Sequence, residues 1–571
     1  MKKKENEEEM SSTALEGAAL VALPVDMIYQ ITDHLSIGSM AKLASTCKGL
    51  HNVIEPEIFR RDRNRGRYRT LEWAATSRKK HAIPVLQRAL TLWPNGIKDL
   101  EIHFLQCRPS KHHGRTLRHK TPLLAAVCTG NLEVVAFLLG KGIDVHQTEA
   151  GNCDSLWSPI HWATMMDYPP KDNQQLEPPR TKLAIIELLL LHGANPDQLS
   201  APNPRRQPPP PESIVSPMHL AIKNDANHHV VELLIKYGGA ATQEPYRHVA
   251  NQHYASISPI SHLIDKYPNP TEDHCSSLRA LATNGGGSGY EARKYTVTGQ
   301  PLLLQFLSYP KESKYAPRFV RIMLKHTQAR VEDTAANGDT AMVHFLRSHV
   351  HWRPAMAYDR RRVTSHEVEH SMALVASVAC RTIDELVDHG AGIDTYGAGR
   401  MTPLHIACGL HCHLSSVFDH LIGRGANVKA RTSRGHTLLH SLVMGDAEAD
   451  FTLMTPLLKQ YKIKRYARDN EGNTFLHLLV TQRLVLFGKW MSEAARHYKR
   501  SDFEDPKLRN HAGRTPLEEA SFGSDANGEV TRFWIQHAFD ERDEHFASKH
   551  KSRDAKRKAQ RADKLAETSL T

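Results

Sequence analysis

The sequence predicts an all-α protein in which a short helical unit precedes a long stack of paired helices. Two recurring patterns carry this prediction. A hydroxyl residue followed by proline and an apolar run, as at Thr121 and Thr402, marks the start of a helix. A second apolar segment such as Val134–Leu139 then leads to a glycine such as Gly142, which suits the left-handed end of a helix. With 40% hydrophobic residues among 571, the chain can bury such cores.

The N-terminal unit is predicted from apolar residues at helical spacing. Pro24 can open a helix because its missing N–H would have no partner there, and the charge of Asp26 suits the helix dipole. Three apolar clusters follow, and we expect Pro56 to end the last one. They comprise Met27, Ile28, Ile31 and Leu35, then Met40, Leu43, Ala44 and Cys47, then Leu50, Val53 and Ile54. So small a unit needs a partner or a neighbouring domain.

This unit resembles an F-box, the helical module that connects a substrate receptor to a cullin-based ubiquitin ligase. The shared pattern is a Leu-Pro start, an isoleucine-rich helix, a leucine-rich helix and a Thr-Cys-Lys-x-Leu segment. The matching residues are Leu23, Pro24, Ile28, Ile31, Leu35, Leu43, Thr46, Cys47, Lys48 and Leu50. Gly38 and Ser39 stand where the family has an acidic residue.

The resemblance implies that residues 20–65 dock on the small adaptor protein that bridges to the cullin. It assigns adaptor binding to Leu23, Pro24, Ile28, Ile31, Leu35, Leu43 and Leu50. A second interpretation stays open, in which three short helices merely cap the repeats.

The paired-helix pattern resembles ankyrin repeats, which bind other proteins. Starts lie at Thr121, Ser158, Ser216 and Thr402, with weaker echoes at Ser258, Gln300, Thr437, Thr474 and Thr515. The ideal period is about 33 residues, and because many spacings are longer we expect insertions. We place the degenerate repeats at 70–540, as one solenoid, with insertions near 169–180, 200–214, 284–298 and 350–370.

The segments Phe59–Asp62 and Leu71–Ala75 look like the junction in fungal F-box/ankyrin proteins, where the chain enters a degenerate first repeat. The chain therefore resembles a fungal-type F-box protein with C-terminal ankyrin repeats. Outside this resemblance, we expect a disordered N-terminus at 1–19 and a basic charged tail at 541–571.

Motifs of catalysis are absent from the sequence: there is no Gly-x-Ser-x-Gly, no phosphate loop and no His-Glu-x-x-His. The cluster of His405, Cys408 and His411–His413 has zinc-binding residue types. However, we expect the repeat-start histidine His405 to hydrogen-bond locally and Cys408 to be a core residue. The sequence thus predicts no catalytic, cofactor-binding or metal-binding residues, and we expect the protein not to be an enzyme.

Composition indicates which class of partner the protein binds and in which cellular compartment it resides. The net charge of +12 is spread along the chain, and with aromatics at 7% we see no basic face interleaved with stacking rings, so nucleic acid is not the expected partner. Eight scattered cysteines indicate a reducing compartment. The charged start Met1–Glu9 is no signal peptide, and no apolar run is long enough for a membrane span. We expect a cytoplasmic protein; the basic tail leaves nuclear import open as an alternative to a solvated terminus.

Together these features predict a substrate-recognition adaptor of an SCF-type ubiquitin ligase, which binds the cullin adaptor through the F-box and an unknown target protein through the repeats. The alternative is an ankyrin-repeat scaffold with no ubiquitin role. A third hypothesis, an enzyme with its site built in an insertion, has no motif in its favour.

Overall fold

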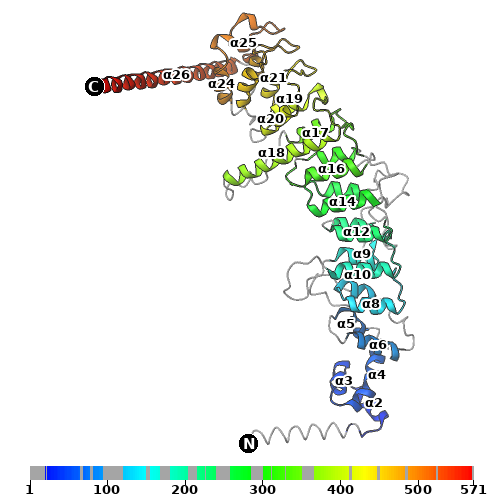
Figure 1. Ribbon diagram of the computed structural model, residues 1–571. Helices are drawn as coiled ribbons and strands as arrows, with labels where there is room; N and C mark the ends of the chain where they lie inside the picture. The colour runs from blue at the N-terminus through cyan, green and yellow to red at the C-terminus, as the bar shows by residue number, and fades with distance from the viewer. Residues whose placement is uncertain are drawn as a thin grey trace. The chain divides into compact units, whose positions relative to one another are not determined.

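A computed structural model describes most of the chain, and nearly every element in it is a helix (Figure 1). The described residues are 20, 22–64, 68–77, 82–93, 120–149, 155–166, 180–202, 215–224, 227–239, 258–284, 300–309, 311–327, 329–349, 365–410, 415–445, 451–481, 487–522 and 525–568. They form two compact units, Met1–Leu263 and Ile264–Thr571. The all-α prediction is confirmed.

The first unit begins with three helices around one small core. Helix α2 (Val25–Asp33) follows Pro24, α3 (Ile37–Ala44) begins after Ser36, whose side chain accepts the N–H of Ser39, and α4 spans Lys48–Asn64. Their shared core consists of Ile28, Met40, Ala44, Leu50 and Ile54. This core contains a residue from each predicted apolar cluster.

One expectation for this unit is wrong, because Pro56 lies inside α4 and does not end a helix. The C-terminal half of α4 is held by side chains. The Arg61 guanidinium donates to the backbone oxygen of Thr32 at the end of α2 (2.6 Å) and to the buried Glu57 carboxylate. Burial opposes ionisation of Glu57, but hydrogen bonds from Arg60 and Arg61 outweigh it and lower the pKa of that carboxyl.

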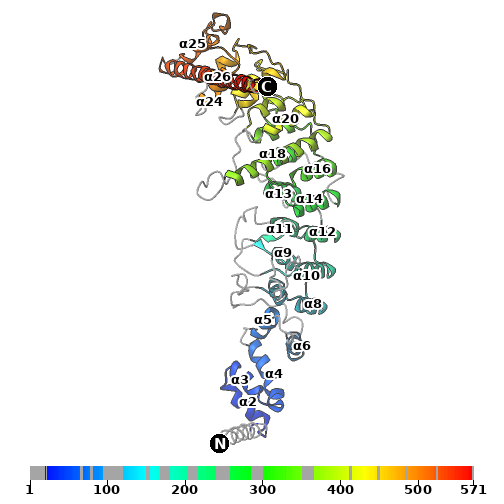
Figure 2. The same ribbon diagram turned by 60° about the vertical axis from the view of Figure 1, so that its left-hand side comes forward.

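Paired helices then follow in the first unit. They are α5 (Arg69–Thr76), α6 (Ala82–Leu92), α7 (Pro122–Thr129), α8 (Leu132–Gly140), α9 (Pro159–Met165), α10 (Arg180–Leu191), α11 (Pro217–Lys223) and α12 (His228–Lys236). First helices pack in the order α5, α7, α9, α11, and second helices in the order α6, α8, α10, α12. Figure 2 shows α8, α10 and α12 in a row beside α9 and α11. Helix α13 (Pro259–Lys266) contains the boundary between the units.

A two-stranded antiparallel sheet joins neighbouring repeats of this unit. Strand β1 (Ser155–Leu156) pairs with β2 (Ala201–Pro202), with Ser155 opposite Pro202 and Leu156 opposite Ala201. The sheet is a local feature of the loops, so the fold remains helical.

The second unit repeats the same pairing. Its helices are α14 (Glu272–Asn284), α15 (Leu302–Leu307), α16 (Ala316–His326), α17 (Ala341–Ser348), α18 (Ser365–Asp388), α19 (Pro403–Cys408), α20 (Ser415–Gly423), α21 (Leu438–Val443), α22 (Met454–Lys459), α23 (Phe475–Thr481), α24 (Phe487–Ala495), α25 (Pro516–Ala520) and α26 (Asp525–Thr568). First helices stack in the order α15, α17, α19, α21, α23, α25.

Local chemistry explains where these helices begin and end. The hydroxyl groups of Thr121, Ser216 and Thr402 accept a backbone N–H three residues on, and proline follows each of them, as the sequence predicts. The glycines that follow second helices have positive φ, which only glycine adopts without strain. They are Gly142, Gly193, Gly238, Gly390 and Gly425.

Several predicted segments fall outside the described residues. Residues 1–19 do so entirely, and the predicted insertions near 169–180, 200–214, 284–298 and 350–370 do so for most of their length. Of the last predicted insertion, the residues from Ser365 onward belong to α18. The predicted tail from residue 541 continues α26 as a helix up to Thr568.

Candidate protein-binding surfaces

Three buried histidines at repeat starts hydrogen-bond to the following repeat. In α21, Nδ1 of His440 lies 2.8 Å from the hydroxyl of Thr437, and its Nε2 lies 3.2 Å from the carbonyl oxygen of Asn473 in the following repeat. Equivalent bonds join His161 to Ser158 and Val215, and His477 to Thr474 and Arg514. Burial lowers the pKa of His161 and His440 to about 4, so both are neutral at pH 7. The local hydrogen bond that the sequence predicts for the repeat-start histidine His405 is thus also made by these three histidines.

His405 differs from the others at one atom. Its Nδ1 lies 2.7 Å from the Thr402 hydroxyl, but its buried Nε2 has no hydrogen-bond partner in the described part of the chain. Cys408 on the same helix is fully buried, and burial raises the pKa of its thiol. Within the described residues no three His, Cys, Asp or Glu side chains group as metal ligands, while His411–His413 lie outside them.

Three arginines hold the loops of the second unit in register. We call the segments 389–402, 424–437, 460–474 and 496–515 fingers, since each connects a second helix to the next first helix. Arg431, Arg468 and Arg509 occupy the same place in three of them, and each donates to the carbonyl of the glycine four residues on. Arg431 and Arg468 also donate to a carbonyl of the next finger, at 2.8 and 2.6 Å.

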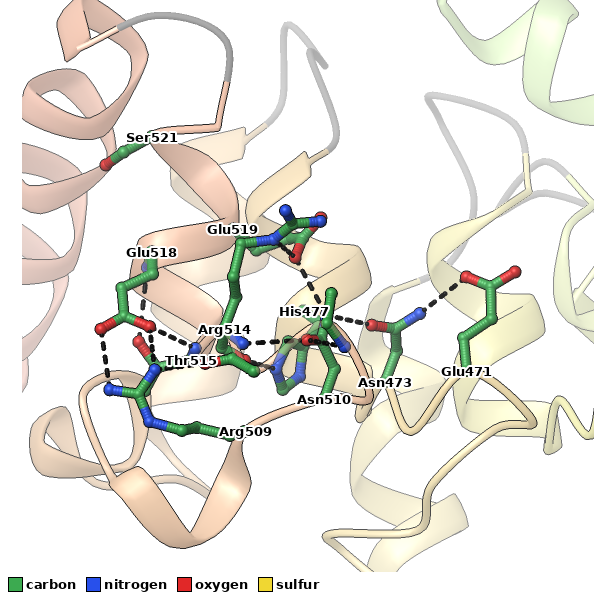
Figure 3. A network of polar contacts seen from close by, with 12 residues as sticks. Glu471, Asn473, His477, Arg509, Asn510, Arg514, Thr515, Glu518, Glu519 and Ser521 are labelled. Carbon is green, nitrogen blue, oxygen red and sulfur yellow. Dashed lines mark hydrogen bonds and ion pairs between the residues drawn. The ribbon is translucent and has the colours of Figure 1, made fainter.

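A polar network joins the last two fingers (Figure 3). The Asn510 amide donates to Asn473 and to the Glu519 carboxylate, both at 2.9 Å. Arg514 pairs with Glu519 at 2.7 Å, and its carbonyl accepts from His477 at 3.1 Å. Burial opposes the charge of Glu519, but its bonds to Arg514 and Asn510 outweigh this and lower its pKa. These contacts fix the geometry of the surface that the fingers form.

A pocket of about 440 Å³ opens between the fingers and the first helices of three successive repeats. Arg347 of α17, His405 of α19 and Ser441 of α21 line it, with Arg434 from a finger. Its apolar lining includes Ala398, Met401, Ile406 and Met444, together with Gly399, Gly409 and Gly445.

The predicted adaptor-binding residues divide into three groups in the N-terminal helices. Pro24 and Ile31 are exposed, whereas Leu23, Leu35 and Leu43 are half-buried against the core. Ile28 and Leu50 are buried core residues, so they support the surface from beneath and do not form it.

Sequence reasoning did not assign three exposed apolar side chains of α2 to this surface. Val25 and Met27 are each 47% exposed, and Tyr29 is 38% exposed. Met27 and Ile31 stand four residues apart and therefore share a face of the helix. The signal in the sequence was an excess of apolar residues around α2, more than one buried stripe requires.

Comparison with known families agrees with the repeat architecture. The family model for the ankyrin repeat matches residues 118–150 and 400–433. These segments contain the predicted starts at Thr121 and Thr402 and the helix pairs α7–α8 and α19–α20. The chain therefore contains ankyrin repeats, which are modules of protein–protein interaction. No curated protein matches the chain.

In the residues that the structure describes, no helix is long and apolar enough to cross a membrane.

Proposed function

We propose that this chain is the substrate-recognition subunit of a cullin-based ubiquitin ligase. The N-terminal helices α2–α4 dock on the cullin adaptor, and the ankyrin repeats hold the target protein. The observation that carries the proposal is the exposed apolar pair Met27 and Ile31, which stand four residues apart on one face of α2. Val25 and Tyr29 are also exposed, on the other flank of the helix. The pair lies in the segment whose residues resemble an F-box.

In this role the chain contributes position and no reacting group. A target held on the repeats stays close to the ubiquitin-conjugating enzyme, and holding two reactants together raises the effective concentration of one near the other. Apolar burial would drive the docking step, at about 25 cal/mol per Å² of apolar surface removed from water.

A second candidate function is an ankyrin scaffold in which α2–α4 only cap the repeats. One observation favours it, because α4 packs on α5 and α6 as a cap would. The indole N–H of Trp93 donates to the carbonyl of Phe59 at 3.3 Å, and the two rings make an edge contact. A cap, however, has no need for an apolar surface on α2.

Binding of the purified cullin adaptor to the full chain separates the two candidates. Met27→Asp combined with Ile31→Asp should weaken binding at least about tenfold, because two charges would enter an apolar interface. Gln30→Asp, which changes an exposed polar residue of the same helix, serves as the matched control. If wild type does not bind the adaptor, or the double variant binds as tightly as wild type, the ligase proposal is wrong and the scaffold remains.

A further inference from the structure

The pocket beside His405 has a defined hydrogen-bond donor without an acceptor. The backbone N–H of Thr402 donates to Nδ1 of His405 at 3.3 Å, so Nδ1 is an acceptor and the ring proton sits on Nε2. Burial lowers the pKa of His405 to about 4, which keeps the ring neutral. In the next repeat the same donor on His440 meets the Asn473 carbonyl. The backbone carbonyls of His436 and Ala430 act on the His405 ring, but Nε2 makes no hydrogen bond of normal geometry within the described residues.

A second buried polar atom of the pocket is also without a partner. Ser441 is 4% exposed, and its hydroxyl oxygen makes no hydrogen bond within the described residues. A buried polar group without a hydrogen bond destabilises the folded state. Two such groups lining one pocket indicate a bound group that accepts hydrogen bonds.

The charges around the pocket select the kind of acceptor. Its charged lining residues are Arg347 and Arg434, and the lining contains no carboxylate. Arg347 is already paired with the buried Asp339 at 2.7 Å. Arg434 is exposed at a fingertip, and the ion pairs found in the part of the chain described do not include it. The Arg434 guanidinium, which is not in an ion pair within the described residues, suits a ligand with a single negative charge.

The hollow itself results from missing side chains. Gly409 and Gly445 approach so closely that a Cβ on Gly445 would collide with the backbone of Gly409. The apolar walls come from Met401, Ile406 and Met444. A methylene stem can therefore lie against these walls while its polar end reaches the donors.

We propose that this pocket binds a glutamate or aspartate side chain on an extended segment of the target protein. The carboxylate accepts from Nε2 of His405 and the Ser441 hydroxyl, and Arg434 attracts it from the rim. This inference deepens the proposed target-binding role of the repeats and is independent of docking by α2–α4.

The test uses the full chain carrying ¹³C-methyl methionine, because Met401 and Met444 report from the pocket walls. The probe is the peptide acetyl-Ala-Leu-Glu-Leu-Ala-amide. It is compared with two control peptides in which Gln or phosphoserine replaces the Glu. We expect saturable chemical-shift changes of both methyl signals with the Glu peptide. The Gln peptide should bind about tenfold more weakly, because it lacks the negative charge of the carboxylate. Equal binding of the Glu and Gln peptides, or shifts only at other methionines, would overturn the proposal. Tighter binding of the phosphoserine peptide than of the Glu peptide would overturn the carboxylate proposal and identify the ligand as a phosphate.

A matched pair of variants tests the charge requirement. Met444 is 47% exposed at the pocket lip, so polar replacements there should leave the fold intact. The Met401 signal is the readout. Met444→Glu should weaken binding of the Glu peptide at least about tenfold more than Met444→Gln does, because the introduced carboxylate repels the carboxylate of the peptide. Equal effects would refute the proposal. Adaptor binding should be unchanged in both variants, so its result reports on the ligase proposal separately.

Discussion

At the scale of the residue, the repeat-start histidines show how burial sets protonation. Each ring bonds to the hydroxyl at the start of its own helix, and those of His161 and His440 also bond to a carbonyl of the next repeat. A proton on these rings would have to be placed in an apolar surrounding. His161, His405 and His440 share a folded-state pKa of about 4, against an ordinary value of 6.5. The unfolded chain therefore binds more protons than the folded chain between these two values.

We predict that the contribution of these histidines to stability is complete above pH 6.5 and falls as the pH drops toward 4. Each histidine contributes at most roughly 3 kcal/mol to this loss, given the depressed pKa. Urea unfolding at pH 7 and pH 4.5 measures it. His440→Asn should reduce the pH dependence, whereas His511→Gln, at an exposed fingertip, should not. An equal dependence in all three proteins would contradict the burial argument.

Lys311 is a buried cation with a polar but uncharged surrounding. Its ammonium donates to the carbonyl of Pro268 at 3.0 Å and lies 3.8 Å from the ring centroid of Phe306. Burial lowers its pKa to about 7. Because the unfolded value is higher, the unfolded state binds the proton more tightly, and this lysine favours folding more as the pH rises above 7.

We therefore predict that wild type gains stability relative to Lys311→Met as the pH rises from 7 to 9. Denaturant unfolding of both proteins at the two pH values measures the difference. Lys325→Met, at an exposed position of α16, is the control and should show a constant difference. A constant difference for Lys311→Met as well would mean that Lys311 is not desolvated in solution.

At the scale of the element, each second helix depends on its neighbours. Leu189 of α10 is fully buried where α10 packs between α8 and α12, whereas Leu191, two residues on, is 64% exposed. A single repeat cannot cover its own apolar face, so damage at one interface should spread to the adjacent repeats.

We predict that Leu189→Asp reduces hydrogen-exchange protection in α8 and α12 as well as in α10. The unpaired buried charge should cost several kcal/mol, while Leu191→Asp should be nearly neutral. Adaptor binding through α2–α4 should persist. Loss of protection confined to residues 158–197 would show that this repeat is an independent domain.

At the scale of the whole molecule, the C-terminal helix begins inside the repeats and leaves them. Residues near the start of α26 pack on α24 and α25, and Arg542 donates to the carbonyl of Ala495 at 3.1 Å. Beyond it, residues 545–571 have no repeat pattern and are strongly polar.

We predict that removing residues 545–571 leaves the thermal unfolding midpoint unchanged, because the side chains that the structure describes in this segment are exposed. The same truncation in a fluorescent fusion tests nuclear import by Lys556–Lys558. A lower nuclear fraction would support an import signal, and an unchanged distribution would assign the segment to a solvated terminus. A lower midpoint would show that the tail contributes to the fold.

Much of the fold could be predicted because it depends on short-range chemistry that one sequence displays. Thr402 caps a helix, Gly425 ends one, and His440 bonds to a hydroxyl three residues away. Each effect involves neighbours in the chain, so the repeat starts and the role of their histidines could be read directly. The same holds for the apolar clusters of α2–α4.

Only the tertiary structure decided which side chains face outward and which meet across repeats. Helix α4 continues through Pro56, and Arg61 in its second half reaches Thr32 of α2. Ile28 lies inward while Met27 lies outward because the core formed with α3 and α4 covers one side of α2. The pocket joins Arg347, His405 and Ser441 from three repeats, residues that no local pattern connects. Local spacing determines where helices form, whereas the packing of distant segments determines which surfaces remain free to bind.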